Sequence, residues 1–360
     1  MSFPTRKIAG VSVSAIGFGA MGIAGAYGAV GDDEERFKVS FVLAYVSDPC
    51  AHLAKVLDAA YEAGCTMWDT ANIYGDSEVL LGKWFKRTGK RDEIYLASKF
   101  GIIGFSGDRV VDGSPEYARK ALETTLSRLE VDCLDLYYLH RADPHVPIEH
   151  TVRAMAEFVK EGKVKHLGLS EVSASTLRRA HAVHPIAAVQ VEYSPFTLDI
   201  EDPKIALLQT CRELGVATIA YSPLGRGFLS GLYRSPDDLD PADFRRMVPR
   251  YNATNFPNIL KIADGLAEIG KKYNASSSQV ALAWLLAQGE DVIPIPGTKK
   301  VKYLEENLAA VKVTLSPEDV AAIRKLAVDA DAAGGRGTHR GFRRCCLLRR
   351  RRFEGVGGLG

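Results

Sequence analysis

Four side chains whose types suit proton transfer follow short apolar runs in the first half of the chain: Asp69, Tyr74, Lys99 and His140. A tyrosine with its ordinary pKa of about 10 is a weak acid, and a neighbouring ammonium lowers that pKa by favouring the phenolate. A buried lysine is costly unless an acid such as Asp69 pairs with it. A histidine can donate a hydrogen bond to a carbonyl oxygen and polarise it. The set suits protonation of the alkoxide that forms when a hydride reaches a carbonyl.

Each of these residues has an ordinary explanation when taken alone. Tyr74 could be a loop aromatic, Lys99 a solvated strand end, Asp69 a helix cap and His140 a core histidine with satisfied hydrogen bonds. All four, however, fall at or just after the C-terminal ends of consecutive predicted strands. Barrel enzymes hold their active sites on that face, so the combination favours catalysis.

Eight short runs rich in β-branched and aromatic residues alternate with longer segments of helical periodicity. The runs are 15–19, 66–69, 94–99, 134–140, 164–170, 187–192, 216–221 and 292–296. Helices are predicted between them, for example at 115–130 with Ser114 as cap, and at 148–161, ending before Gly162. The predicted fold class is α/β, a single (β/α)8 TIM barrel with an N-terminal β-hairpin and a C-terminal helix.

The composition, 46% apolar and 25% charged over 360 residues, is typical of a folded globular chain. No run approaches the roughly 18 consecutive apolar residues of a membrane span, and the N-terminal sequence lacks the apolar part of a secretory signal. We therefore expect a cytoplasmic protein with no membrane partner. The six cysteines contain no CxxC pair, so neither a metal site nor a disulfide framework is predicted.

The basic residues are concentrated at the C-terminus. Residues 335–360 carry eight arginines and one acid, whereas the whole chain has a formal charge of +2. Residues 1–334 are therefore net acidic, which gives no reason to expect nucleic acid as a partner. We predict a barrel domain over 1–334 and a disordered basic tail over 335–360. The alternative is a tail that binds anionic membrane, with acylation at Cys345 or Cys346.

Residues 39–55 interrupt what would otherwise be the first helix of the barrel. Without them, an acidic turn and Phe37 would continue directly into Leu57 and Ala60 on one helical stripe. The first two residues, Val-Ser, can be encoded GTAAGT and the last, Lys, AAG, which matches the ends of an intron. A retained intron is therefore our hypothesis. The alternative is a genuine insertion that forms an irregular loop, since loops tolerate insertions at small entropic cost.

The segment Trp-Asp-Thr-Ala-Asn-Ile-Tyr-Gly-Asp-Ser-Glu at 68–78, with Lys99 and His140, resembles the Asp/Tyr/Lys/His tetrad of the aldo/keto reductases. The resemblance covers residues 6 to about 335, apart from 39–55. It implies that the barrel binds NADP(H) in extended form without a Rossmann fold. It also implies that the chain reduces a small-molecule aldehyde or ketone by hydride transfer. A homo-oligomer is a separate expectation. Tyr74 is then the general acid.

The resemblance implies further contacts to the cofactor at the strand ends. They are Gly19, Ala20 and Met21 after the first strand, Asp69 at the end of the second, Ser170 and Glu171 after the fifth, and Gln190 in the sixth. They continue with Tyr221, Ser222, Leu224 and Gly227 after the seventh strand, and with Gly297, Thr298, Lys299, Glu306 and Asn307 after the eighth. Glycines 17, 19 and 22 also match a dinucleotide-binding fingerprint. The glycine-rich segment that follows is a poor helix, so we interpret it as a flexible loop beside the cofactor.

Two positions depart from the family pattern. Glu171 stands where the family commonly has asparagine, and a carboxylate can accept from an amide NH2 but cannot donate to its carbonyl. Tyr303 stands where the family often has an arginine for the 2′-phosphate. Lys299, Lys300 and Lys302 supply positive charge nearby, which favours NADPH over NADH. The alternatives are a merely solvated helix start for these lysines and, for Tyr221, a core aromatic.

Two other functions stay open. The β subunits of potassium channels share this barrel and act as cofactor-binding regulatory subunits, and turnover of a generic aldehyde would separate the two. A reductase impaired by residues 39–55, next to the expected cofactor loop, is the other. Substrate identity is not predicted because specificity resides in variable loops. We expect the loop at 228–258, with Phe196 and Tyr233, to shape the substrate pocket.

Overall fold

The computed structural model describes most of the barrel domain. The described ranges are 3–24, 49–104, 109–241 and 243–330. The predicted tail at 335–360 and residues 39–48 of the predicted insertion lie outside them. Within these ranges no helix is long and apolar enough to cross a bilayer, and no three His, Cys, Asp or Glu side chains are arranged to hold a metal ion.

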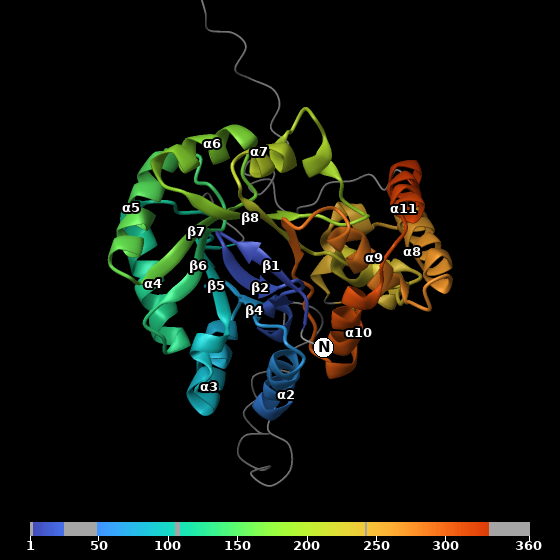
Figure 1. Cartoon of the computed structure of the whole chain (residues 1–360), viewed down its shortest axis with the longest axis horizontal. Helices are drawn as coiled ribbons and strands as arrows, with labels where there is room; N and C mark the ends of the chain where they lie inside the picture. The colour runs from blue at the N-terminus through green and yellow to red at the C-terminus, as the bar shows by residue number, and fades with distance from the viewer. Residues whose placement is uncertain (1–2, 25–48, 105–108, 242, 331–360) are drawn as a thin grey trace, which may run out of the picture.

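Eight parallel strands stand at the centre of the molecule, with helices around them (Figure 1). They are β3 (Phe18–Gly19), β4 (Met67–Asp69), β5 (Tyr95–Phe100), β6 (Leu134–Leu139), β7 (Val164–Ser170), β8 (Ile186–Glu192), β9 (Ala217–Tyr221) and β10 (Val292–Pro294). Each pairs with the next in chain order. The N–H groups of Gly17 and Gly19 donate to the carbonyls of Pro294 and Pro296 at 2.9 and 3.0 Å, which joins the last strand to the first. The predicted barrel is confirmed.

Helices follow the strands and cover the outside of the barrel. They are α2 (Pro49–Glu62), α3 (Ser77–Thr88), α4 (Pro115–Leu129), α5 (Ile148–Lys160), α6 (Ala174–Val183), α7 (Leu207–Glu213), α8 (Phe256–Lys271), α9 (Ser277–Leu286), α10 (Val301–Ala309) and α11 (Pro317–Ala330). Short 3-10 helices are η1 (Ala20–Ala24), η2 (Arg91–Glu93), η3 (Asp199–Glu201), η4 (Gly225–Ser230), η5 (Pro236–Asp238), η6 (Phe244–Met247), η7 (Pro249–Tyr251) and η8 (Ala310–Lys312). The Ser114 hydroxyl caps α4 by accepting from the N–H of Tyr117, as predicted.

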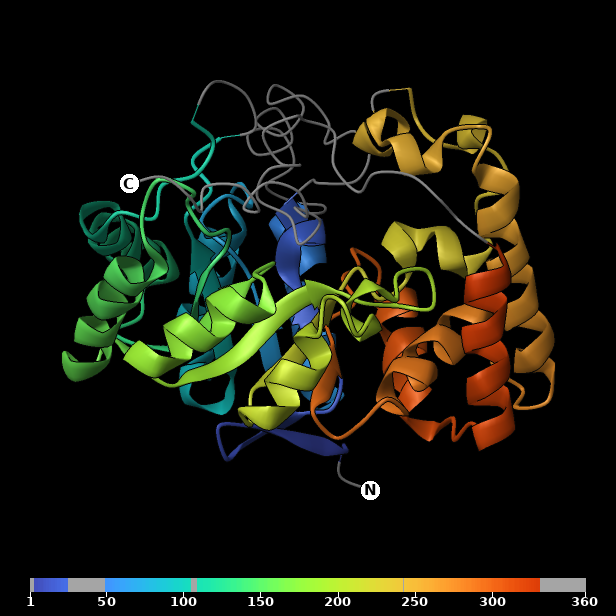
Figure 2. The same ribbon diagram turned by 90° about the horizontal axis from the view of Figure 1, so that it is seen from above.

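The N-terminal hairpin covers one end of the barrel (Figure 2). It consists of β1 (Thr5–Ile8) and β2 (Val11–Ser14), and its Ile8 and Val13 pack with the apolar side chains inside the barrel. Arg6 fastens it by donating to the carbonyl oxygens of Leu286 and Gly289, both at 2.6 Å. The predicted hairpin and the predicted C-terminal helix, α11, are thus confirmed. The carboxyl ends of the eight parallel strands lie at the opposite end of the barrel.

Two sequence predictions need correction near the first strand. Residues 49–55, predicted to belong to an insertion and, if genuine, to an irregular loop, form the first half of helix α2 and continue into Val56. The loop predicted after Gly19 begins instead with η1. Ala20 and Ile23 are buried in the core, so η1 gains apolar burial that a flexible loop would lack. Whether 39–55 derive from an intron stays a hypothesis.

Candidate active site

Asp69 and Lys99 form an ion pair at the ends of strands β4 and β5. The Lys99 ammonium donates to Asp69 Oδ1 and, at 2.7 Å, to the carbonyl of Thr70. The side chain of Lys99 is 0% exposed and that of Asp69 is 3% exposed. Asp69 Oδ2 accepts from Gln190 Nε2 at 2.7 Å. Burial raises the pKa of Asp69, while the charge of Lys99 and the two hydrogen bonds oppose that rise. The predicted counter-charge for Lys99 is therefore in place.

Strand alternation explains why Asp69 faces the inside of the barrel. The preceding residue, Trp68, packs outward against Trp84 of α3, with ring centroids 4.5 Å apart. Successive side chains of a strand point to opposite faces, so Asp69 points inward. Lys99 follows the same rule after the outward Ser98, which donates to the buried Glu78 carboxylate at 2.7 Å.

The loop that carries Tyr74 is tied to the same two strands. The N–H of Asn72 donates to the carbonyl of Lys99 at 3.1 Å, and the N–H of Ser77 donates to the carbonyl of Tyr74 at 3.0 Å. The hydroxyls of Thr70 and Ser77 lie 2.7 Å apart and close the base of the loop. The half-buried Tyr74 ring then has the Lys99 ammonium 5.0 Å from its centroid.

The pKa of Tyr74 is raised overall, whereas the sequence predicts that it is lowered. Burial raises this pKa above its ordinary value, and the charge of Lys99 lowers it, as predicted, but by less. The nearby Asp69 adds to the rise and Arg141 opposes it. Because removal from water disfavours a phenolate, Tyr74 stays protonated at neutral pH and is available as a proton donor.

His140 extends strand β6 by one backbone bond, from its N–H to the carbonyl of Phe100 at 2.7 Å. Its ring faces that of Tyr74 edge to face, with centroids 5.8 Å apart and planes at 83°. Burial, with the charges of Arg141 and Lys99, holds the pKa of His140 well below its ordinary value. Among the described residues Nδ1 has no hydrogen-bond partner. A neutral imidazole carries one ring N–H, which suits a hydrogen bond to a ligand.

The next two strands bring further polar groups to this end of the barrel. Ser170, Glu171 and Gln190 are all buried. The Glu171 N–H donates to the carbonyl of Gln190, and its carboxylate accepts from the N–H of Glu192, both at 3.0 Å. Glu171 is held in the left-handed region, with φ of +52°. Glu171, which departs from the family pattern, thus links the ends of β7 and β8.

The segment after β9 bends sharply beside the half-buried Tyr221, which packs against the barrel interior. Ser222, Arg226 and Gly227 have φ of +49°, +57° and +92°. Leu224 precedes η4 and its carbonyl accepts from the N–H of Gly227 at 3.0 Å. This backbone course places three of the predicted cofactor residues in one tight turn.

Arg245 holds this turn in place and was missed by sequence reasoning. Its buried guanidinium donates to the carbonyl of Arg226 at 2.8 Å and pairs with Asp243. Tyr233, which stays a prediction for the substrate pocket, lies against Arg245, with the guanidinium 4.7 Å from its ring centroid. Phe196, also expected there, is buried and stacks on Tyr251. An arginine two residues after an aspartate is too common a spacing to signal this role.

The segment after β10 lies against strand β3. A Cβ on Gly297 would come 2.5 Å from the carbonyl oxygen of Gly19, so the backbones touch there and neither position tolerates a side chain. Ala20 and Met21 begin η1 beside this contact. The Thr298 hydroxyl accepts from the N–H of Lys300 at 3.1 Å.

Three more predicted residues follow on or before α10. Burial lowers the pKa of Lys299. Glu306 accepts from the hydroxyl of Ser276 at 2.6 Å, and Asn307 is buried. The Lys300 ammonium lies 5.6 Å from the ring centroid of Tyr303. The predicted residues up to Lys299 thus lie on, or shortly after, strand ends, whereas Glu306 and Asn307 lie in the second half of α10.

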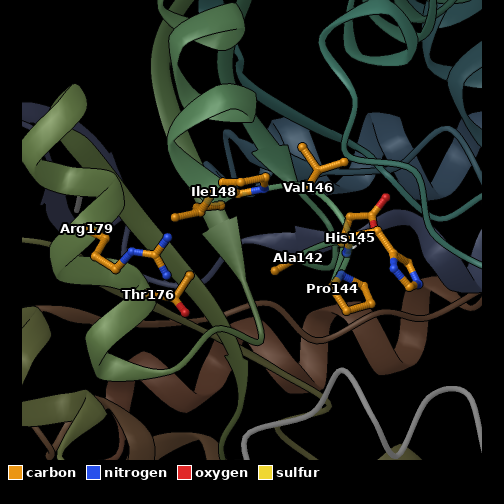
Figure 3. A pocket seen from close by; sticks show the side chains of 9 residues that line it. Ala142, Pro144, His145, Val146, Ile148, Thr176 and Arg179 are labelled. Atoms are coloured by element: carbon orange, nitrogen blue, oxygen red, sulfur yellow. Dashed lines mark hydrogen bonds between the residues drawn. The ribbon is translucent and has the colours of Figure 1, made fainter. Parts of the chain in front are cut away.

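A separate pocket of about 440 Å³ lies between residues 142–148 and helix α6 (Figure 3). Thr176 and Arg179 line it from the helix, as Figure 3 shows. Arg179 is already paired with Glu149 through two hydrogen bonds of 2.7 Å. None of the four tetrad side chains lines this pocket, so it is distinct from the candidate active site.

Comparison with known proteins identifies the family of the chain. The model of the aldo/keto reductase family matches residues 15–328. The chain is 58% identical to aldo-keto reductase str7 of Strobilurus tenacellus over 346 residues, 95% of this chain and 97% of that protein. It is 46% identical to aldo-keto reductase yakc [NADP(+)] of Schizosaccharomyces pombe, over 93% of this chain and 95% of that protein.

Solved structures show the same architecture. A thermostable aldo-keto reductase in complex with the inhibitor epalrestat aligns with a TM-score of 0.66 at 29% identity, over 90% of this chain and all of that one. The glycerol dehydrogenase of Gluconobacter oxydans aligns with a TM-score of 0.77 at 24% identity, over 94% and 99%, and supports the fold. From the family match and the two relatives, the chain belongs to the aldo/keto reductase family, whose members are oxidoreductases.

Proposed function

We propose that this chain reduces a small aldehyde or ketone to the alcohol with NADPH, using Tyr74 as general acid. The observation that carries the proposal is the placement of Lys99, which pairs with the buried Asp69 and lies 5.0 Å from the Tyr74 ring centroid. A neutral His140 faces the same tyrosine. Proton donor, cation and hydrogen-bond donor are thus gathered at one point of the strand-end face.

The residues present fit an NADP(H) cofactor. At one end, the hydroxyl of Ser170, the amide of Gln190 and the half-buried ring of Tyr221 suit an aromatic ring that bears a carboxamide. At the other end, Thr298 and Lys299 suit a phosphate. A relative that is 46% identical carries NADP(+) in its name, which supports the same choice. NADPH, when bound, supplies the hydride for the carbonyl carbon.

The chain's own residues manage the proton and the developing charge. His140 donates a hydrogen bond to the carbonyl oxygen, and Tyr74 gives its hydroxyl proton to that oxygen as the alkoxide forms. The ammonium of Lys99 then stabilises the phenolate that remains until solvent returns the proton. Asp69 supplies the counter-charge to the buried Lys99 and holds it in place.

Consumption of NADPH in the presence of a panel of aldehydes and ketones tests the proposal. Turnover of at least one carbonyl by the unmodified chain, lost in Tyr74→Phe, is the expected result. Tight NADPH binding without turnover of any carbonyl would favour a regulatory subunit instead. The same assay on a chain without 39–55 shows whether that segment impairs activity. A cytoplasmic location and a homo-oligomeric state stay predictions.

A further inference from the structure

Arg141, next to His140, connects two groups that the proposed reaction needs. Its side chain is buried, and its Nη1 donates to the carbonyl of His140 at 2.6 Å and to Ser170 Oγ at 3.1 Å. The guanidinium therefore bridges the end of β6, which carries the proposed carbonyl-polarising histidine, and the end of β7, which carries a proposed cofactor residue.

The bond to Arg141 fixes what the Ser170 hydroxyl can offer a ligand. A guanidinium has only donors, so Ser170 Oγ must be the acceptor in this pair. A hydroxyl that accepts through one lone pair keeps its own hydrogen for a different partner. Arg141 thereby favours Ser170 as a hydrogen-bond donor.

Glu171, the neighbouring residue, has the opposite character. An ionised carboxylate only accepts, and this one already takes the N–H of Glu192. A carboxamide needs a donor for its oxygen and an acceptor for its NH2. Ser170 and Glu171 can meet both needs only if Ser170 donates. An asparagine at 171 would supply a donor as well as an acceptor, so its absence leaves the Ser170 hydroxyl and the second N–H of the Gln190 amide as the donors at this point.

We infer that Arg141 is a positioning residue that commits Ser170 to donate a hydrogen bond to the carboxamide oxygen of the nicotinamide ring. The inference rests on the proposed function, since it needs NADP(H) at this site. Both hydrogen bonds come from the single nitrogen Nη1, so the task depends on where that donor group lies and not only on the charge of Arg141.

Three ligands separate this role from a general structural one. NADP⁺ has the whole carboxamide, its 3-acetylpyridine analogue keeps the carbonyl but lacks the NH2, and 2′-phospho-ADP-ribose lacks the nicotinamide. Their dissociation constants would be measured by calorimetry for the unmodified chain, Arg141→Met, Ser170→Ala and the double variant. Arg179→Met is the matched control, since Arg179 lies outside the proposed site and pairs with Glu149.

Both single variants should weaken NADP⁺ and the acetylpyridine analogue by about five- to tenfold, the usual effect of one hydrogen bond. They should leave 2′-phospho-ADP-ribose within about twofold, and the double variant should bind NADP⁺ no more weakly than Ser170→Ala. Equal weakening of all three ligands by Arg141→Met, or additive losses in the double variant, would overturn the inference.

Two further results keep the test decisive. If Arg141→Met does not fold, Arg141→Gln keeps a polar side chain that is too short to reach Ser170, and the same loss restricted to the two nicotinamide ligands is expected; a uniform loss, or none, contradicts the inference. If the unmodified chain binds neither NADP⁺ nor 2′-phospho-ADP-ribose, the proposed function itself fails, whereas binding of both with no change in any variant refutes only the role of Arg141.

Discussion

The ammonium of Lys99 lies 5.0 Å from the ring centroid of Tyr74 while it donates to the carboxylate of Asp69. One cation thus neutralises a buried acid and stands beside the proposed proton donor. Because the pair is fully enclosed, its charges are weakly screened by solvent, and the effect of Lys99 on Tyr74 persists at physiological salt.

Tyr74→Phe removes only the hydroxyl, so the fold and the binding of NADPH should survive. Steady-state reduction of a carbonyl should fall by about 10² or more, the usual scale for the loss of a positioned acid. Tyr117→Phe is the matched control, because the Tyr117 hydroxyl accepts from Asn72 of the same loop at 3.3 Å. Full turnover by Tyr74→Phe would exclude Tyr74 as the proton donor.

Lys99→Met should suppress turnover and also destabilise the protein, because it leaves Asp69 buried and unpaired. Breaking a buried pair costs about 3–5 kcal/mol. Burial already raises the pKa of Asp69, and without Lys99 that pKa rises further. A raised carboxyl pKa disfavours the folded state above it, so the loss should be larger at pH 8 than at pH 5. Thermal unfolding at both values measures this.

Lys86→Met is the control for that experiment, because Lys86 is exposed and pairs with Glu130 on the surface. It should change the stability by less than about 1 kcal/mol at either pH. A Lys99→Met protein as stable as the control at pH 8 would contradict the buried ion pair.

The rate of reduction should be nearly independent of pH between about 7 and 9. The pKa of His140 is held well below its ordinary value, so the ring is neutral throughout this range. The pKa of Tyr74 is raised, so its proton is also present throughout. Profiles of kcat against pH at saturating NADPH test this, and a step near pH 6.5 to 7.5 would show that His140 titrates normally.

Gly168→Ala should destabilise the barrel. A Cβ at this position would lie 2.4 Å from the ring of Tyr138, which is fully buried inside the barrel. Overpacking of this kind costs about 1–3 kcal/mol. Chemical denaturation measures the loss, and Gly22→Ala, whose Cβ would have 3.8 Å to its nearest neighbour, is the control. Equal stability of the two variants would contradict the packing.

The barrel and the tetrad were predictable because their signals are local. Strand alternation and residue type are enough to place Asp69 and Lys99 on one face. The roles of Arg141 and Arg245 were not predictable, since each depends on a backbone carbonyl whose position only the folded chain defines. The net direction of the Tyr74 pKa was also missed, because a sequence shows the neighbouring lysine but not how much water the fold removes.

The choice between NADPH and NADH should depend on Lys299 and Lys300. The two cofactors differ by one phosphate on the adenosine ribose, and these lysines are the cations that precede α10. Burial lowers the pKa of Lys299, yet a bound phosphate would favour its charged form. Charge-assisted contacts of this kind change affinity by about ten- to hundredfold.

Changing both lysines to alanine should therefore weaken NADPH much more than NADH, and should leave kcat at saturating cofactor nearly unchanged because the tetrad is untouched. Dissociation constants for both cofactors measure the difference, with the exposed Lys312→Ala as control for a general loss of positive charge. If the unmodified protein binds NADPH and NADH equally well, the two lysines are solvated surface, and Tyr303, where the family often has arginine, marks a genuine loss of 2′-phosphate recognition.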